Sequence, residues 1–409
     1  MRRLALAMTL LVPGAASAAS CDGTACGFAT LKPFLAKLAA ARPTPGKRPV
    51  HIIQIGDSHT AGDVLTGAWR DILQARYGNG GRGVLAPGRP WDGYVTRGVT
   101  ASMSPGWLVS ATFGKGSTEP HPALGLSSYT LTATQPGATV GLTADSPAMA
   151  FDRVAYCGPV SPINSSILVR FGPPGQVINS KADVSTPGCT TFRIAAPQTS
   201  FTVTGAEGPV MLSSIATFRD NGGVALSNLG VVGAQLQHFA RTDDDLLGYE
   251  LTAYAPDLIV LAFGTNEGFS PRLDPAAYEA GLRGQIARLR RLSPGTPILL
   301  LGAPDALSRN AALRTNADGA AIDCPDSGSA PLFAPPALAV VRGIQRKVAS
   351  DLKLAFWDWQ AAMGGACAAR RWTDAQPPLM RPDHVHFLRA GGQILAQRLQ
   401  ADLDRAMKD

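Results

Sequence analysis

Apolar residues along this chain follow two alternating patterns outside its middle segment. Short, mostly apolar runs, which predict buried β-strands, lie at 50–55, 258–263, 297–301 and 354–357. Apolar residues spaced every three or four positions, which predict amphipathic helices, occur at 28–42, 64–77, 275–292, 337–352 and 388–407. Strands that alternate with helices predict an α/β fold, in which helices cover both faces of a parallel sheet.

The middle segment, residues 99–221, has no helical periodicity and is rich in Ser, Thr, Val, Gly and Pro. Short strand-like runs recur there at 128–133, 138–143, 166–171, 191–194, 200–204 and 210–215. Regular short strands with turn signals between them are typical of an antiparallel β-sandwich. We therefore expect one α/β domain formed by residues 19–98 and 222–409, with a β-sandwich inserted at 99–221.

The N-terminal residues have the pattern of an export signal. Arg2 and Arg3 precede the apolar stretch 4–12, and residues 16–18 read A-S-A, a typical cleavage site. We expect residues 1–18 to be a signal peptide and the protein to be exported to the periplasm or cell envelope. No other apolar run is long enough to span a bilayer, so no transmembrane segment is expected after signal removal.

The six cysteines fit an oxidising compartment, because disulfides form and persist there. Six cysteines allow 15 connectivities. No cysteine or histidine spacing typical of a metal site occurs, and neither a metal nor a cofactor is expected. Proximity in sequence favours the pairs Cys21–Cys26, Cys157–Cys189 and Cys324–Cys367.

Composition narrows the class of partner. Hydrophobic residues make up 45% and charged residues 16% of the 409 residues, which is typical of a globular protein. The formal net charge of +7 is not gathered into a basic stripe with interleaved aromatic residues, which argues against nucleic acid as a partner. A mild positive charge is compatible with an anionic wall polymer or a membrane surface.

Two distant segments carry residues suited to nucleophilic catalysis. Ser58 directly follows a predicted buried strand, at the edge of the sheet where sites of open α/β folds form. Asp383 and His386 lie in the loop before the last predicted helix, spaced so that the carboxylate can orient the imidazole. We predict Ser58 as nucleophile, His386 as general base and Asp383 as its orienting group. His384 remains a rival base, because the loop conformation decides which ring faces Ser58.

Two further turns contain candidate hydrogen-bond donors for an oxyanion. Gly233 lies in a turn after a strand-like stretch, where a glycine lets a backbone N–H approach a ligand closely. Asn266 follows the strongest buried strand, and its side-chain amide is a neutral donor. We predict an oxyanion hole formed by the N–H groups of Ser58 and Gly233 and by the Asn266 amide.

These segments, in this order, resemble the four motif blocks of the SGNH/GDSL hydrolase superfamily. Gly56-Asp57-Ser58 matches its first block, Gly233 its second, Gly264-Thr265-Asn266 its third, and Asp383 with His386 its last. The resemblance implies a three-layer α/β/α fold and favours His386 over His384 as the base. Two positions depart from the pattern, since His59 replaces the leucine of the GDSL name and Glu267 stands where an aspartate often follows.

Within that superfamily, the chain is most similar to peptidoglycan O-acetylesterases. The likeness rests on Gly-Asp-Ser-His at 56–59, the expected signal peptide and the position of the β insert. It implies that the insert is jelly-roll-like and that it is a carbohydrate-binding module. Trp91 and Tyr94 are candidate sugar-stacking residues beside the site.

The expected function is that of an exported serine esterase that removes O-acetyl groups from a cell-wall polysaccharide, with peptidoglycan as the expected glycan. Three alternatives stay open: an acetyl transferase, a lipase or thioesterase with the same site, and a non-catalytic glycan-binding wall protein. Acyl length, the glycan and the oligomeric state do not follow from the sequence.

Overall fold

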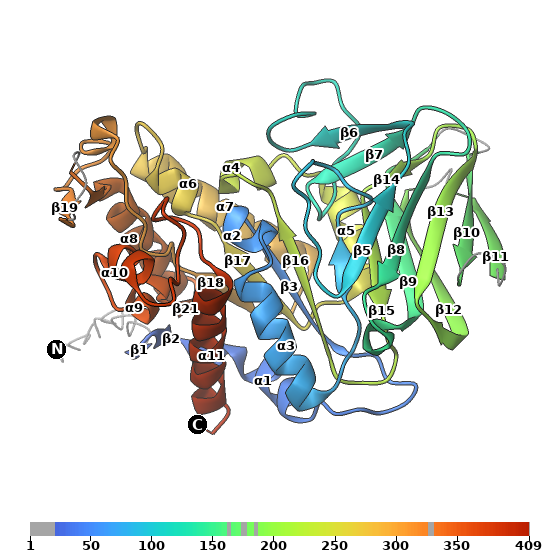
Figure 1. Ribbon diagram of the computed structural model, residues 1–409, viewed down its shortest axis with the longest axis horizontal. Helices are drawn as coiled ribbons and strands as arrows, with labels where there is room; N and C mark the ends of the chain where they lie inside the picture. Colours follow the sequence, from blue (N-terminus) through green and yellow to red (C-terminus); the bar gives the residue numbers. More distant parts are fainter. Residues whose placement is uncertain (1–20, 162–164, 173–177, 184–186, 326–330, 409) are drawn as a thin grey trace, which may run out of the picture.

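The computed structural model describes residues 21–161, 165–172, 178–183, 187–325 and 331–408. The predicted signal peptide lies outside these ranges. A seven-stranded sheet forms the centre of one half of the molecule (Figure 1). Its strands, in spatial order, are β1 (Cys21–Asp22), β2 (Ala25–Cys26), β21 (Ala355–Trp357), β18 (Ile298–Leu301), β17 (Leu258–Ala262), β3 (Val50–Gly56) and β16 (Val224–Gly230). The five strands from β21 to β16 are parallel, and β2 and β1 continue the sheet in antiparallel pairing.

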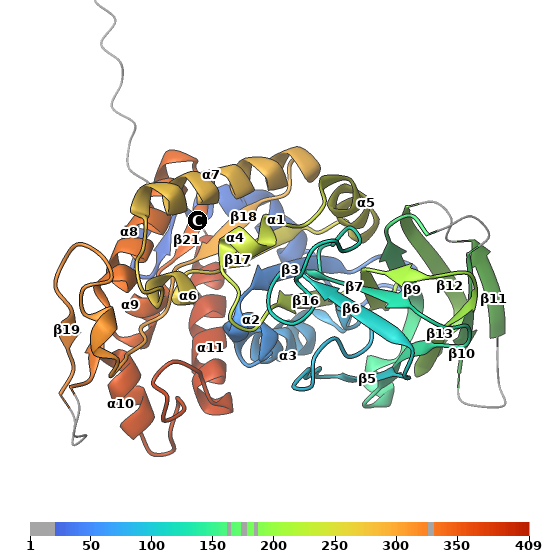
Figure 2. The same cartoon turned by 90° about the horizontal axis from the view of Figure 1, so that it is seen from above.

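Helices cover both faces of this sheet, as the alternation of strands and helices predicts (Figure 2). One face carries α1 (Lys32–Ala39), α3 (Leu65–Tyr77), α9 (Trp359–Met363), α10 (Ala368–Asp374) and α11 (Arg389–Ala406). The other carries α5 (Asp244–Tyr254), α7 (Pro275–Leu292) and α8 (Pro336–Asp351). Local signals set the helix starts: at α7, the Asp274 side chain accepts from the Ala277 N–H, and Pro275 occupies the first turn.

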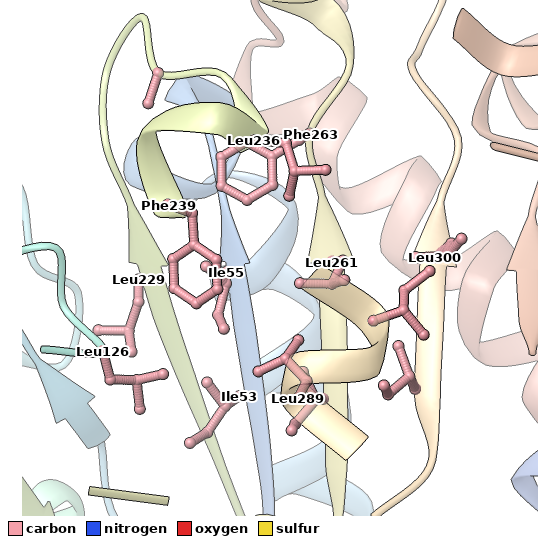
Figure 3. Close-up of a cluster of buried hydrophobic side chains, with 14 of the residues drawn as sticks. Ile53, Ile55, Leu126, Leu229, Leu236, Phe239, Leu261, Phe263, Leu289 and Leu300 are labelled. Carbon is pink, nitrogen blue, oxygen red and sulfur yellow. The ribbon is translucent and has the colours of Figure 1, made fainter. Parts of the chain in front are cut away.

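Each parallel strand contributes to two cores because successive side chains point to opposite faces. Ile53 and Ile55 pack with Leu261 against α7, whereas Ile52 packs on the side of α3 and α11. Figure 3 shows the first of these cores, with Leu289 of α7 over the sheet. Burial on both faces explains why these strands are mostly apolar runs in the sequence. The predicted three-layer α/β/α fold is confirmed.

The segment between β4 (Gly83–Leu85) and β16 folds into antiparallel sheets beside this domain (Figure 1). A five-stranded sheet contains β11 (Ile178–Asp183), β10 (Ser166–Phe171), β13 (Ser200–Glu207), β8 (Thr139–Ala144) and β5 (Val99–Met103). A four-stranded sheet contains β12 (Gly188–Gln198), β9 (Phe151–Gly158), β15 (Ser214–Phe218) and β4. A three-stranded sheet contains β14 (Met211–Leu212), β7 (Tyr129–Ala133) and β6 (Trp107–Ala111). The predicted interruption of the α/β fold by antiparallel sheets is confirmed.

The insert and the α/β domain share structure at their junction. β4 precedes the expected boundary at residue 99, yet it pairs with β15 of the insert, and Leu85 belongs to the insert's core. Glu250 of α5 is fully buried and accepts hydrogen bonds from the insert residues Leu126, Ser213 and Ser214. The division at 98/99 and 221/222 therefore remains a proposal, whereas the docking of the two parts is a feature of the fold.

A buried ionic cluster stabilises the turn between α2 (Ser58–Ala61) and α3. Asp63, which has a left-handed φ of 49°, accepts from Thr66 at 2.6 Å and from Arg70 at 2.8 Å. Arg82 lies 3.4 Å from the same carboxylate. Burial alone would raise the pKa of Asp63, but the two guanidinium groups outweigh it and lower the pKa. A charge buried in this way is stable only with its partners.

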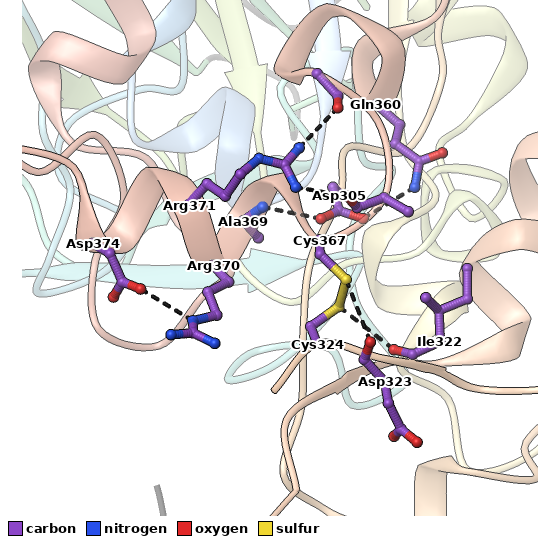
Figure 4. The surroundings of a disulfide bond; sticks show 12 residues. Asp305, Ile322, Asp323, Cys324, Gln360, Cys367, Ala369, Arg370, Arg371 and Asp374 are labelled. Atoms are coloured by element: carbon purple, nitrogen blue, oxygen red, sulfur yellow. Dashed lines mark hydrogen bonds and ion pairs between the residues drawn. A yellow bond between two sulfur atoms is a disulfide. The ribbon is translucent and has the colours of Figure 1, made fainter. Parts of the chain in front are cut away.

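The three disulfides predicted from sequence proximity are all confirmed. Cys157–Cys189 joins paired residues of β9 and β12. Cys324–Cys367 joins the segment beside β19 (Ile322–Asp323) and β20 (Phe333–Ala334) to the start of α10 (Figure 4). Beside it, the buried Asp305 accepts from the Ala369 N–H at 3.0 Å. Among the described residues, no helix combines the length and apolar content needed to cross a bilayer.

We expect Asp63→Asn to lower the free energy of unfolding by about 3–5 kcal/mol, because it leaves two buried guanidinium groups without their shared carboxylate. Urea denaturation measures this loss. The matched control is Asp71→Asn, whose carboxylate is 68% exposed and pairs with Arg97, so that it should cost no more than about 1 kcal/mol. Equal losses in the two variants would show that the buried cluster has no special importance.

Candidate active site

The turn after β3 presents Ser58 at the carboxyl edge of the sheet. The strand ends at Gly56, Asp57 caps α2 by accepting from the His59 N–H at 2.9 Å, and Ser58 is the first helical residue. Gly56 is required by close packing, since a Cβ there would lie 2.5 Å from the carbonyl oxygen of Ala262. The tight turn thus leads directly from a buried strand into a helix N-terminus.

The structure brings Ser58, His386 and Asp383 together in one chain of hydrogen bonds. Ser58 Oγ lies 2.9 Å from His386 Nε2, although the two residues are 328 positions apart. His386 Nδ1 lies 2.9 Å from Asp383 Oδ2. Since a carboxylate can only accept, Nδ1 carries the hydrogen and Nε2 is left as the acceptor for the serine hydroxyl. This is the geometry in which an imidazole can remove a proton from a serine.

Asp383 also shapes the loop that carries the imidazole. Its Oδ1 accepts from the backbone N–H groups of Val385 and His386, both at 2.9 Å. Partial burial would raise the pKa of Asp383, but its hydrogen bonds with His386 and Val385 lower the pKa overall. The carboxylate therefore stays ionised at neutral pH and orients the ring.

The rival imidazole points elsewhere. His384 Nδ1 lies 3.0 Å from the hydroxyl of Thr373, which belongs to α10. The backbone of His384 has a φ of 56°, a left-handed conformation that turns the chain between Asp383 and Val385. The geometry thus pairs His386, rather than His384, with Ser58.

The two other predicted donors lie on either side of Ser58. Gly233 is in the turn between β16 and α4 (Leu236–Phe239), and its φ of 77° suits glycine. Asn266 is in α6 (Thr265–Gly268), directly after β17. Since β16 and β17 are the two neighbours of β3, the three turns meet at one edge of the sheet.

One hydrogen of the Asn266 amide is engaged, because Nδ2 donates to the Ala234 carbonyl at 2.9 Å. This bond fixes the amide beside the Gly233 turn. The second N–H of the amide is left to donate to a ligand. Within the described part of the chain, the backbone N–H groups of Ser58 and Gly233 have no protein acceptor. All three groups are thus candidates to donate to an oxyanion, and their catalytic roles remain predictions.

Sequence reasoning noted His59 as a departure from the GDSL pattern and as part of Gly-Asp-Ser-His, but gave it no role in the site. The structure places it beneath the loop that carries His386, with its side chain 2% exposed. Its Nε2 lies 3.0 Å from the Val385 carbonyl oxygen, and its ring stacks on that of His386 with centroids 5.5 Å apart. A histidine directly after the candidate nucleophile was the available signal, but the contact spans 326 positions.

The insert also reaches the site, which the sequence did not reveal. Phe113, in the loop between β6 and β7, stacks on His238 of α4 with ring centroids 4.2 Å apart. A Cβ on Gly233 would lie 2.9 Å from this phenyl ring. His238 Nδ1 in turn accepts from the Gln235 N–H at 2.9 Å. The loop that contains Gly233 is therefore packed against the insert.

The two predicted sugar-stacking residues are packed in an aromatic cluster. Trp91 stacks on Tyr129 of the insert, with centroids 5.2 Å apart, and lies edge-on to Tyr94. Burial raises the pKa of the Tyr94 hydroxyl. Among the described residues, no hydrogen bond or ring contact joins Trp91 or Tyr94 to Ser58 or His386. Their role in substrate binding remains a prediction.

A second carboxyl group lies deep under the site. Glu267 is 5% exposed, and burial raises its pKa to about 7. Its Oε1 accepts from the Leu236 N–H at 2.8 Å, which holds the start of α4. In the described ranges, no group of three or more His, Cys, Asp and Glu side chains has a metal-binding arrangement.

Comparison with known proteins gives a family-model match over part of the chain and a structural likeness over most of it. Residues 212–394 match the model of the GDSL-like lipase/acylhydrolase family. That range includes Gly233, Asn266, Asp383 and His386, whereas Ser58 lies outside it. Comparison with curated protein sequences gave no match.

Among solved structures, a peptidoglycan O-acetylesterase is similar with a TM-score of 0.73 and 26% identity, over 92% of this chain and 96% of its own. A family two carbohydrate esterase from Cellvibrio japonicus aligns over 76% of this chain and 98% of its own, with 14% identity and a TM-score of 0.28. A putative GDSL-like lipase from Parabacteroides merdae aligns over 45% and 73%, with 19% identity and a TM-score of 0.31. The family model and the first of these structures confirm the resemblance inferred from the four motif blocks.

We expect Asn266→Ala to lower kcat for p-nitrophenyl acetate by about 10²–10³-fold, the usual cost of one oxyanion donor. KM should change little, because the donor acts on charge that develops after binding. Asn310→Ala is the control, since Asn310 is an exposed cap of a 3₁₀ turn. An unchanged kcat in Asn266→Ala would remove this residue from the oxyanion hole.

Proposed function

We propose that this chain, an esterase of the GDSL type, removes O-acetyl groups from a polysaccharide of the cell envelope, with peptidoglycan as the substrate. The observation that carries the proposal is the unbroken line from Ser58 Oγ to His386 to Asp383, with 2.9 Å at each step. Carbonyl carbons of esters are the electrophiles that such an activated serine attacks.

In the acylation step, Ser58 Oγ attacks the ester carbonyl while His386 Nε2 takes the hydroxyl proton. The negative charge on the carbonyl oxygen is stabilised by the N–H groups of Ser58 and Gly233 and by the Asn266 amide. The carbon–oxygen bond to the sugar then breaks, and His386 returns the proton to the departing sugar oxygen. Asp383 stabilises the imidazolium that exists between these two transfers.

Deacylation repeats the same sequence with water as the nucleophile. His386 takes a proton from water as its oxygen attacks the acetyl-serine carbonyl. The bond between the acetyl carbon and Ser58 Oγ breaks, and His386 gives the proton back to the serine. Acetate leaves and the free hydroxyl is restored.

Three features support a polysaccharide of the envelope as the substrate. The similarity to a peptidoglycan O-acetylesterase extends over 92% of the chain and therefore includes the insert. The insert packs Phe113 against the Gly233 turn, which is consistent with one glycan contacting both parts. The three disulfides favour export to an oxidising compartment such as the periplasm. A carbohydrate-binding role of the insert is part of this proposal.

We expect purified protein to release acetate from O-acetylated peptidoglycan and to hydrolyse p-nitrophenyl acetate, and Ser58→Ala to lose at least about 10³-fold in kcat on both substrates. Acetate release and p-nitrophenol absorbance are the measurements. Ser146→Ala is the control, because Ser146 is exposed and its side chain caps nothing.

Three outcomes would replace the proposal. Equal or faster hydrolysis of long-chain p-nitrophenyl esters would favour a lipase or thioesterase. Transfer of the acetyl group to an added sugar in preference to water would identify an acetyl transferase. Absence of turnover, together with no labelling of Ser58 by a fluorophosphonate, would leave a glycan-binding protein without catalysis.

A further inference from the structure

We propose that His59 is a positioning residue for this reaction: as a buried imidazolium it donates from one nitrogen to Asp57 and from the other to the Val385 carbonyl, and so fixes His386 over Ser58. The inference rests on the proposed function for its kinetic consequences. Its structural core, the charge of His59 and the bond to Val385, is independent of that function.

The nearest partner of each ring nitrogen of His59 is a group that can only accept. Nδ1 lies 3.2 Å from Asp57 Oδ1, with the Thr265 hydroxyl farther away at 3.5 Å, and Nε2 lies 3.0 Å from the Val385 carbonyl oxygen. A neutral imidazole has one N–H, so one of these buried acceptors would face a lone pair. Without an N–H on Nε2, the buried Val385 carbonyl would lose this donor, which costs about 1–3 kcal/mol. Without one on Nδ1, a lone pair would face the Asp57 carboxylate, so the two contacts together favour a ring with both nitrogens protonated.

His51 is also buried, but the partners of its ring nitrogens favour a neutral ring. Its Nδ1 lies 2.9 Å from the Tyr254 carbonyl oxygen, but its Nε2 lies 2.7 Å from the hydroxyl of Ser227. That hydroxyl already accepts from the Val84 N–H, so it can donate its own hydrogen to Nε2. A neutral ring satisfies both contacts, and burial lowers the pKa of His51 to about 4. The two histidines therefore differ in charge because their hydrogen-bond partners differ, and not because one is more buried.

Two carboxylates near His59, those of Asp57 and Asp383, favour its cationic form. Burial alone would lower the pKa of His59, but Asp57, the Val385 carbonyl and the more distant Asp383 together raise the pKa. On α6, Glu267 ionises near pH 7 and adds negative charge toward Asp57. Among the described residues, His386 is the only titratable group in ring contact with His59, and its other ring nitrogen is hydrogen-bonded to Asp383.

The bond to Val385 acts on the residue directly before the base. The loop of Asp383 to His386 lies at the surface, where the His386 side chain is 38% and Asp383 44% exposed. Contacts with the buried residues under this loop must therefore hold the loop in place. His59 supplies a hydrogen bond to the Val385 carbonyl, a stacked ring against His386 and a ring contact with Phe387 at 5.3 Å. Loss of these contacts would let Nε2 drift from Ser58 Oγ.

The arrangement predicts two limbs in the pH profile of kcat. The acid limb is the one expected of any reaction that uses an imidazole as general base. His59 has a raised pKa in the folded protein, so its stabilising contribution is present below the ordinary histidine pKa and is lost as the pH rises through the folded value. Deprotonation of His59 then removes one donor and loosens the loop, which lowers kcat on the alkaline side.

Two substitutions at residue 59 test the kinetic part. His59→Gln keeps a donor near the position of Nε2 but cannot titrate, so the alkaline limb should disappear while kcat at neutral pH stays within about 10-fold of wild type. His59→Phe keeps the stacked ring without a donor, and kcat should fall by about 10²-fold with little change in KM, because a shift of about 1 Å costs that much. The substrate is p-nitrophenyl acetate.

The control is His121→Gln, which replaces a histidine in the insert loop and should leave kcat and both limbs unchanged. Thermal unfolding verifies that each variant is folded. An unchanged alkaline limb in His59→Gln, or a folded His59→Phe with the kcat of wild type, would overturn the positioning role. Wild-type protein without esterase activity would instead overturn the proposed function.

A nitrogen NMR spectrum of the protein labelled with ¹⁵N-histidine tests the charge without any assay of activity. At pH 7 we expect two protonated ring nitrogens for His59 and one for His51, with the His59 signals identified by their loss in His59→Gln. A single protonated nitrogen on His59 would overturn the inference, whatever the kinetics show.

Discussion

The register of three neighbouring parallel strands, which end side by side at one edge of the sheet, determines where the candidate site forms. β3 lies between β16 and β17, and its register pairs Gly56 with Gly230 on one side and with Ala262 on the other. The chain therefore leaves all three strands at the same height, and the turns that follow carry Ser58, Gly233 and Asn266 to one edge. A slip of one strand would move its turn along the sheet and reverse its buried face, which the two apolar cores oppose.

The base and its carboxylate reach this edge by a different route, since they belong to no strand of the sheet. Their loop is held by local backbone hydrogen bonds, such as that from the Arg381 N–H to the His386 carbonyl at 2.8 Å, and by side-chain contacts. Asp383 binds two backbone N–H groups of the loop, and Phe387 stacks on Trp359 with ring centroids 5.5 Å apart. His59 connects the two halves, because it follows Ser58 in sequence and contacts the Val385 carbonyl. The half of the site on the sheet is rigid by backbone pairing, whereas the other half is only as well placed as these contacts make it.

Local pattern predicted the elements of the fold, and the order of the motif blocks predicted that Ser58 and His386 meet; other contacts between distant segments had no signal in the sequence. The apolar strands, the long helices and Ser58 were readable because burial on two faces and the turn after β3 leave local signatures. Local sequence did not decide between His384 and His386, since the choice depends on a left-handed φ at residue 384; only the family resemblance favoured His386. α5 was missed although Asp243 caps it, because its apolar residues form only a weak stripe along the helix. The contact of Phe113 with Gly233 joins two loops that share no sequence signal.

The insert is a docked part of the enzyme, and this constrains how it can act. Glu250 lies at 0% exposure between α5 and the insert, and burial raises its pKa despite the hydrogen bonds that it accepts. A carboxyl group so placed costs free energy unless its donors stay in position, so the two parts cannot rotate freely about their junction. β4–β15 pairing adds backbone bonds to the same interface. A glycan held by the insert would thus meet Ser58 in a fixed orientation. Selectivity for one acetyl position on the glycan would then arise from the fixed geometry of the two parts, rather than only from the higher local concentration of a tethered substrate.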